Sequence, residues 1–155
     1  MLRYLLIIPL LLTAFVNRAD CFERAGRDYH IDPDLLRAIA WVESKGNINA
    51  LGKNPTQGIG LGYMQIDSQN FDHLAQFGIT PELLMNDGCM NIYTGAYYLA
   101  TAFKRWGVNW DAVGAYNAGF KKTDEQARRR QIYVRKVYPV YLAYKKDRRS
   151  FLSQE

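Results

Sequence analysis

Apolar residues recur every three or four positions over most of this chain, a spacing that predicts amphipathic helices. The clearest case is a helix expected at 33–45. Its inward side would carry Leu35, Leu36, Ile39, Ala40 and Val42. Asp32 and Pro33 suit a helix start, and Gly46 suits the position just past a helix end.

Similar patterns predict helices at 21–30, 81–86, 89–106, 110–117 and 131–146. The glycines at 47–62 predict a loop, followed by a short extended or turn segment at 63–66. The polar stretch 121–130 predicts another loop, and Pro139 predicts a kink in the last helix. We therefore expect a mainly α (α+β) fold, a single domain with a small irregular or β-like middle segment.

The N-terminus has the pattern of a secretory signal peptide. Arg3 precedes an apolar run at 5–15, which is shorter than the roughly 20 residues of a membrane-spanning helix. An uncleaved N-terminal anchor is the alternative, and Asp20 before Cys21 disfavours a lipoprotein signal. The expected division is a signal peptide at 1–19, one folded domain at 20–146 and a charged C-terminal tail at 147–155.

Length and charge narrow the possible functions. The 155 residues suffice for one compact domain, and 48% are hydrophobic, which allows a packed core. The net charge is +5, and removal of Arg3 and Arg18 with the signal leaves +3. This mild excess suits an anionic polymer, whereas nucleic-acid binding would require a denser basic cluster.

Cys21 and Cys89 are the two cysteines. In an exported protein such a pair predicts a disulfide, with two free thiols as the alternative. The cysteines and the distant His30 and His73 lack the spacing of metal ligands, so no metal site is expected.

Glu43 is the first candidate for chemistry, because it follows the apolar run Ile39-Ala40-Trp41-Val42 at the end of the predicted helix. The alternative is a glutamate whose stem packs while its carboxylate stays in water. If apolar neighbours remove water from the carboxyl, its pKa rises and it can act as a general acid.

Two further stretches combine glycine with hydrogen-bonding side chains. In 60–66, glycines would let a ligand approach the backbone closely, and Gln65 would offer its amide to a sugar; a plain turn entering a strand is the alternative. In 115–119, Tyr116 and Asn117 would hold an N-acetyl sugar, unless they only end a helix capped by Gly119.

The order and spacing of these motifs resemble the soluble lytic transglycosylase (SLT) domain over about 21–141. The matching residues are Glu43-Ser44, Gly62-Tyr63-Met64-Gln65, Asn91-Ile92, Gly95-Ala96-Tyr97-Tyr98-Leu99, Ala115-Tyr116-Asn117 and Tyr133-Val134. They are similar to the family's Glu-Ser, Gly-Leu-Met-Gln, Asn-Ile, Gly-Ala-x-Tyr-Leu, Ala-Tyr-Asn and late Tyr-Val. The resemblance implies a lysozyme-like fold that acts on peptidoglycan without a metal or organic cofactor.

The resemblance also implies a role for each residue. Glu43 would be the one catalytic acid and base, oriented by Ser44. Substrate contacts or groove walls would come from Ser44, Gly62, Tyr63, Met64, Gln65, Tyr116, Asn117 and Tyr133. The product would be a 1,6-anhydromuramoyl end, formed without water.

The small size and the signal resemble specialised transglycosylases of envelope-spanning machines, the type III secretion (IagB- and IpgF-like) and the conjugation or type IV groups. This implies a periplasmic location, a secretion- or conjugation-apparatus partner, and membrane contact only through the signal. Two departures concern the subgroup: Gly60 stands where some members carry Asp, and Tyr63 replaces the usual Leu. A hydrolytic lysozyme, with Asp67 as second acid, and a non-catalytic wall-binding protein are the alternatives.

Overall fold

The computed structural model describes residues 20–54 and 58–152, so the expected signal segment 1–19 and the end of the tail lie outside it. The elements are α1 (Cys21–Tyr29), α2 (Pro33–Ser44), β1 (Leu51–Asn54), β2 (Gly58–Leu61), β3 (Ile66–Asp67), η1 (Ser68–Asn70), α3 (Phe71–Ala75), α4 (Pro81–Asn86), α5 (Gly88–Trp106), α6 (Trp110–Ala118) and α7 (Asp124–Leu152). The predicted mainly helical domain with a β-like middle is confirmed. No helix of the described ranges is both long and apolar enough to cross a membrane.

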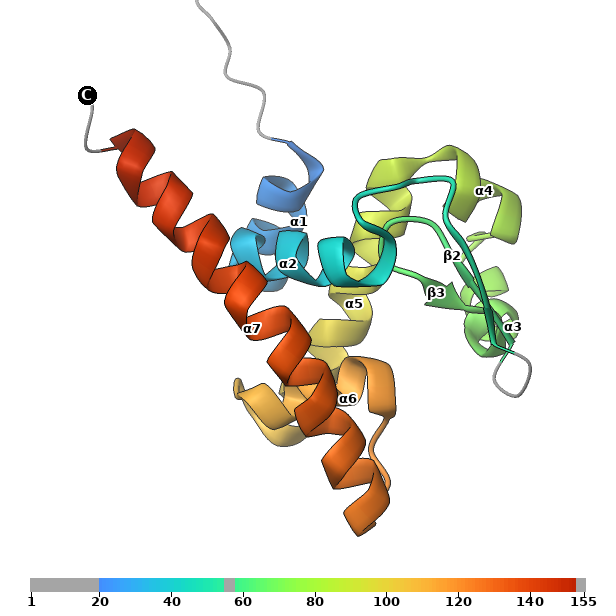
Figure 1. The fold of residues 1–155 in the computed structure, drawn as a ribbon. Helices are drawn as coiled ribbons and strands as arrows, with labels where there is room; N and C mark the ends of the chain where they lie inside the picture. Colours follow the sequence, from blue (N-terminus) through green and yellow to red (C-terminus); the bar gives the residue numbers. More distant parts are fainter. Residues whose placement is uncertain (1–19, 55–57, 153–155) are drawn as a thin grey trace, which may run out of the picture.

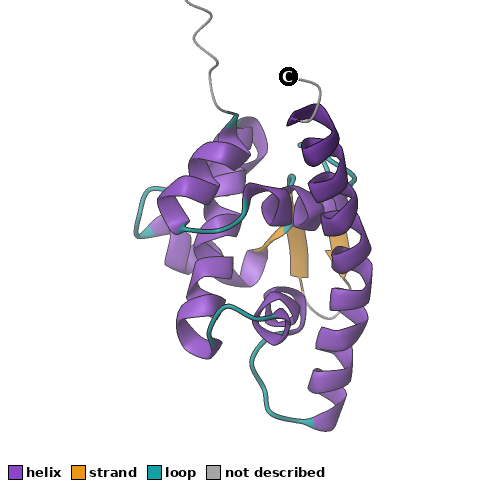
Figure 2. Ribbon diagram, turned by 90° about the vertical axis from the view of Figure 1, so that its left-hand side faces the viewer, coloured by secondary structure: helices purple, strands orange, loops and turns teal. Residues whose placement is uncertain are grey.

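The long helix α7 follows one edge of the domain (Figures 1 and 2), and the small sheet lies with α3 and α4 on the opposite side (Figure 1). Helix α7 packs against α2 and α6, while α5 packs against α1 and α6. The core between them is aliphatic, as the apolar pattern predicted. Its fully buried side chains include Leu36, Ile39, Met64, Leu74, Leu84, Leu99 and Val137.

Helix α2 begins as the sequence predicted. The side chain of Asp32 accepts a hydrogen bond from the backbone N–H of Asp34, and Pro33 occupies the first turn. The helix ends one residue earlier than expected, because Lys45 adopts the left-handed conformation with φ 57°. Glu43 is therefore the last residue but one of α2.

The segment expected as a loop at 47–62 contains a β-hairpin instead. Strands β1 and β2 pair antiparallel with Leu51 opposite Leu61, and β3 adds to β2 with Ile66 opposite Leu61. The glycines that argued against regular structure have a packing role, because a Cβ at Gly52 or Gly60 would collide with the Gln65 side chain. Glycine therefore allows the hairpin to form here.

The amide of Asn91 on α5 joins the hairpin to the helices. Asn91 is fully buried, and its Nδ2 donates to the carbonyls of Leu61 and Leu84 at 2.9 and 3.1 Å. Its Oδ1 accepts the backbone N–H of Met64 at 2.8 Å. One side chain thus satisfies three buried backbone groups from β2, α4 and the turn after β2.

A disulfide joins Cys21 at the start of α1 to Cys89 at the start of α5, which confirms the predicted pairing. The bond closes a loop across 68 residues, for which chain entropy gives about 4 kcal/mol of stabilisation. The guanidinium of Arg24 lies beside it, with Nη2 at 3.2 and 3.0 Å from the two sulfurs.

Helix α7 is longer at both ends than the expected 131–146. At its start, Arg130 is nearly buried over the Trp106 ring and donates to the carbonyls of Gly119 and Lys121. These tertiary contacts hold a polar segment that sequence reasoning interpreted as a loop. Pro139 lies inside the helix without interrupting it.

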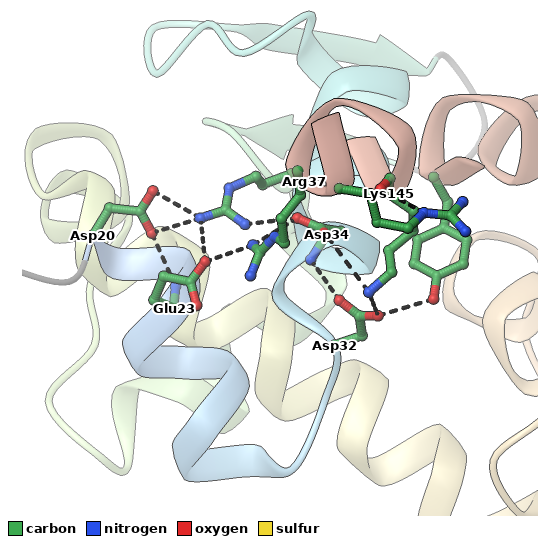
Figure 3. A network of polar contacts seen from close by, with 9 residues as sticks. Asp20, Glu23, Asp32, Asp34, Arg37 and Lys145 are labelled. Atoms are coloured by element: carbon green, nitrogen blue, oxygen red, sulfur yellow. Dashed lines mark hydrogen bonds and ion pairs between the residues drawn. The ribbon is translucent and has the colours of Figure 1, made fainter. Parts of the chain in front are cut away.

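The end of α7 is fastened by ion pairs to α1 and α2 (Figure 3). Asp34 is only 2% exposed and pairs with Arg37 and Arg148, at 2.9 and 2.8 Å. Lys145 reaches Asp32 at 2.9 Å. Helix α7 thus continues into the residues expected as a charged tail, as far as Leu152.

Asn91→Ala should lower the free energy of unfolding by about 3 kcal/mol or more, because it leaves three buried backbone groups without partners. Denaturant unfolding followed by circular dichroism would measure the change. Asn49→Ala, at an exposed position, is the matched control and should change stability by less than about 0.5 kcal/mol. Equal stability of the two variants would contradict the role given to Asn91.

Candidate active site

Glu43 faces a cavity between α2, α6 and the first half of α7. The cavity has a volume of about 250 Å³. Its lining comprises Val42, Glu43, Asn117, Ala118, Gln126, Arg129, Ile132, Tyr133 and Lys136. Among these residues Glu43 is the one carboxylic acid.

The hydroxyl of Tyr133 donates to Glu43 Oε1 at 2.6 Å, a contact between residues 90 positions apart. Tyr133 is 4% exposed and comes from the face of α7 that packs on α2. The family resemblance implied that Tyr133 is a substrate contact or a groove wall. Tyr133 does line the cavity, and its hydroxyl is bonded to the carboxyl of Glu43.

Burial raises the pKa of the Glu43 carboxyl above its usual range. Tyr133, the positive charge of Lys136 and hydrogen bonding from Asn117 act in the opposite direction but do not cancel the effect of burial. The site therefore favours the neutral acid while providing hydrogen bonds for the carboxylate. A group with both properties can release a proton and take one back.

Tyr116 on α6 connects this site to the turn after β2. Its hydroxyl donates to the carbonyl of Met64 at 2.8 Å. Burial, together with the nearby charge of Glu43, raises the pKa of Tyr116 and of Tyr133 well above the usual value. Both phenols therefore remain neutral hydrogen-bond donors throughout the physiological range.

The predicted Gly-Tyr-Met-Gln motif forms that turn. Gly62 has φ 71°, and a Cβ there would collide with the amide of Asn91. Met64 is fully buried, and its side chain packs against Gly95. Gln65 was expected to offer its amide to a sugar, but Nε2 donates to the carbonyls of Ala50 and Gly62, at 3.2 and 2.9 Å. The amide N–H groups of Gln65 thus brace the hairpin.

Two other predicted residues point elsewhere. The hydroxyl of Ser44 donates to the carbonyl of Ala40 at 3.0 Å, one turn back along α2, and not to Glu43. Tyr63 packs edge-on against Phe22, with ring centroids 6.4 Å apart, and does not line the Glu43 cavity. Asn117, in contrast, lies in the cavity as expected.

Asp67 caps the short helix η1, accepting the backbone N–H of Gln69 at 2.8 Å. It does not line the Glu43 cavity. The structure thus gives Asp67 the role of a helix N-cap. In the part of the chain that the structure describes, no three His, Cys, Asp or Glu side chains gather into a metal-binding group.

Sequence reasoning missed Gln126, Arg129 and Lys136, which also line the cavity. A helical signal did exist, because Arg129, Tyr133 and Lys136 stand at positions i, i+4 and i+7. The signal was lost when 121–130 was interpreted as a loop.

The Transglycosylase SLT domain family matches residues 20–138 of this chain. The chain belongs to the SLT domain family. Family membership agrees with the resemblance found in Glu43-Ser44 and Ala115-Tyr116-Asn117, and the family is one of lytic transglycosylases.

Relatives of this SLT domain include the X polypeptide of Escherichia coli, 59% identical over 142 residues, covering 91% of this chain and 84% of the relative. The invasion protein IagB of Salmonella typhimurium is 36% identical, covering 89% of this chain and 85% of the relative. Protein IpgF of Shigella flexneri is 35% identical, with 82% of each covered.

The fold is similar to a solved structure of the lytic transglycosylase Slt from Pseudomonas aeruginosa, with a TM-score of 0.64 and 22% identity. The match covers 82% of this SLT domain protein and 24% of the Pseudomonas chain. The predicted lysozyme-like fold is therefore confirmed.

Tyr133→Phe should raise the pKa of Glu43 further, because it removes a hydrogen bond that favours the carboxylate. NMR titration of the Glu43 side-chain carbonyl carbon would measure the shift. Tyr138→Phe, at an exposed position on the same helix, should leave the pKa unchanged. A fall in the Glu43 pKa in the first variant would contradict the assignment.

Glu43→Gln should keep the fold and gain stability relative to the parent as pH rises. Because the folded-state pKa is raised, the parent loses stability as pH rises from the unfolded pKa through the folded pKa. The Glu43→Gln variant has no ionisable group at this position. Its stability advantage over the parent should therefore be absent below the pKa that Glu43 has in the unfolded state.

Unfolding in denaturant at about pH 3.5 and about pH 7.5 brackets this change. Exposed Glu82 has a lowered pKa, so Glu82→Gln should show the reverse trend. The interpretation would be wrong if the stability of Glu43→Gln relative to the parent were lower at neutral pH than at acid pH.

Proposed function

We propose that this protein is a peptidoglycan lytic transglycosylase. It cleaves the β-1,4 bond between N-acetylmuramic acid and N-acetylglucosamine and leaves a 1,6-anhydromuramoyl end. The observation that carries the proposal is the half-buried acid Glu43, which has a raised pKa, accepts the Tyr133 hydroxyl and is the single carboxylic acid lining its cavity. Membership of the SLT family supports the same reaction.

Glu43 acts first as an acid. Its proton passes to the bridging oxygen, and the bond from C1 of the muramoyl residue to that oxygen breaks. The 2-acetamido group of the substrate stabilises the positive charge at C1, and the polar side chain of Asn117 lies in the cavity to position that group. Burial of Glu43 favours this step, because it raises the pKa of the carboxyl and so favours its protonated form.

Glu43 then acts as a base. Its carboxylate, supported by the hydroxyl of Tyr133, takes the proton of the muramoyl C6 hydroxyl while that oxygen attacks C1. The ring closes, Glu43 is protonated again, and no water is consumed. One carboxyl suffices because the two proton transfers follow each other, whereas most hydrolytic glycosidases use a pair.

A lysozyme would hydrolyse the same bond with a second acid or a positioned water. The location of Asp67 at a helix cap, outside the cavity, disfavours that alternative. A non-catalytic wall-binding protein is disfavoured as well, because it would gain stability by replacing a buried acid with a neutral residue.

We further propose that the enzyme opens the cell wall locally for a type III or type IV secretion apparatus. The relatives IagB and IpgF support this context, since IagB is described as an invasion protein. The disulfide fits an oxidising compartment, and so supports export to the periplasm after removal of residues 1–19.

Glu43→Gln should lower the cleavage rate of purified peptidoglycan by about 10³-fold or more, since it removes the general acid and base. Mass spectrometry of the released fragments would give the rate and the product. Wild-type protein should release anhydromuramoyl ends only.

Glu82→Gln, outside the cavity, is the control and should retain full activity. Reducing muramoyl ends from the wild type would show a lysozyme. Binding to the wall without any fragments would favour the non-catalytic alternative.

A further inference from the structure

One face of α7 carries two cations into the Glu43 cavity. Arg129, Ile132, Tyr133 and Lys136 follow one another at helical spacing and all line this cavity. Tyr133 occupies the centre of the face and holds Glu43. The two cations therefore stand one turn to either side of the residue that contacts the acid.

The side chain of Lys136 makes no hydrogen bond or ion pair with another residue in the described part of the chain. Its charge does act on Glu43. In the mechanism proposed above, Glu43 carries its proton before cleavage, and the charge of Lys136 then faces a neutral acid. Arg129 pairs with Glu125 at 2.6 Å, but both side chains are about half exposed, so this pair is weak.

The surrounding segment concentrates the charge of the protein. Residues 121–136 contain seven basic and two acidic side chains, an excess equal to the net charge of the whole chain, +5. At the other end of α7 the cations Lys145 and Arg148 are neutralised by Asp32, Glu23 and Asp34. Two cations of this segment, Arg129 and Lys136, line the cavity itself.

We propose that Lys136, with Arg129 as a second cation, binds a carboxylate of the glycan substrate beside the bond that is cleaved, and so selects acid-bearing strands over neutral ones. This inference rests on the proposed function. Two sources of carboxylate are present in peptidoglycan: the lactyl group of a muramoyl residue whose peptide has been removed, and the peptide stem itself. A carboxylate next to a lysine gains a charge-assisted hydrogen bond that a neutral amide lacks.

A rival role for Lys136 is to adjust the pKa of Glu43 only. That role would change cleavage of every strand by the same factor and would leave binding unchanged once Glu43 is replaced by a neutral residue. Binding measured in a Glu43→Gln parent therefore separates the two roles, because that parent neither cleaves nor titrates at this position.

The test compares Lys136→Met in the Glu43→Gln parent with Arg135→Met in the same parent. Arg135 is the neighbouring exposed cation of α7 and does not line the cavity, so both variants lose one charge. Binding is measured to native strands, to strands freed of peptide by an amidase, which exposes the lactyl carboxylate, and to both after coupling to methylamine, which neutralises their carboxylates.

We expect Lys136→Met to weaken binding of the acid-bearing strands about 5-fold, a value between those of buried and exposed charged contacts. Binding of the neutralised strands should not change in Lys136→Met. Arg135→Met should change binding of the acid-bearing strands by less than 2-fold, as expected for the loss of a distant charge. Lys136→Arg should restore most of the loss. A loss limited to native strands would assign the peptide stem, and a loss with amidase-treated strands would assign the lactyl group.

Equal binding by Lys136→Met and the parent overturns the inference. So does an equal loss on acid-bearing and neutralised strands, which would indicate a structural effect. If the parent binds none of the strands, the proposed function itself fails and this inference fails with it.

Discussion

The buried amide of Asn91 is the contact on which the arrangement of the site depends. It binds the backbone of Leu61, Met64 and Leu84, so it fixes the turn after β2 against α5. The carbonyl of Met64 in turn accepts a hydrogen bond from the hydroxyl of Tyr116. Tyr116 lies close enough to Glu43 for the charge of Glu43 to contribute to its raised pKa. A buried polar side chain that satisfies all its neighbours specifies one arrangement of the backbone, because any shift leaves groups unpaired.

Glu43 occupies a position where an acid lowers the stability of the fold. An amphipathic helix would carry an apolar residue at the position of Glu43, and burial makes its charged form costly. Helix α7 compensates in part by supplying Tyr133, whose hydroxyl donates a hydrogen bond to the carboxyl and favours its charged form. The contact between α2 and α7 therefore also affects the pKa of Glu43, because the hydrogen bond from Tyr133 depends on the position of α7.

The cations near the two ends of α7 have different surroundings. Toward its C-terminus, Lys145 and Arg148 pair with the acids of α1 and α2 and fix the helix to the domain (Figure 3). Toward its start, the cations beside Glu43 are left largely without partners. The same residue types therefore stabilise the fold at one end of α7 and provide a positive field at the other.

The sequence by itself determined the helices of the core, because apolar spacing and the caps at Asp32 and Thr80 are local properties. It also singled out Glu43 as a candidate and contained the motif order of the family. Tertiary structure alone decided that Gln65 braces a hairpin and that Tyr133 holds Glu43. It also decided that α7 extends from Asp124 to Leu152. The physical reason is that each of these features depends on partners far away along the chain, which local propensity does not contain.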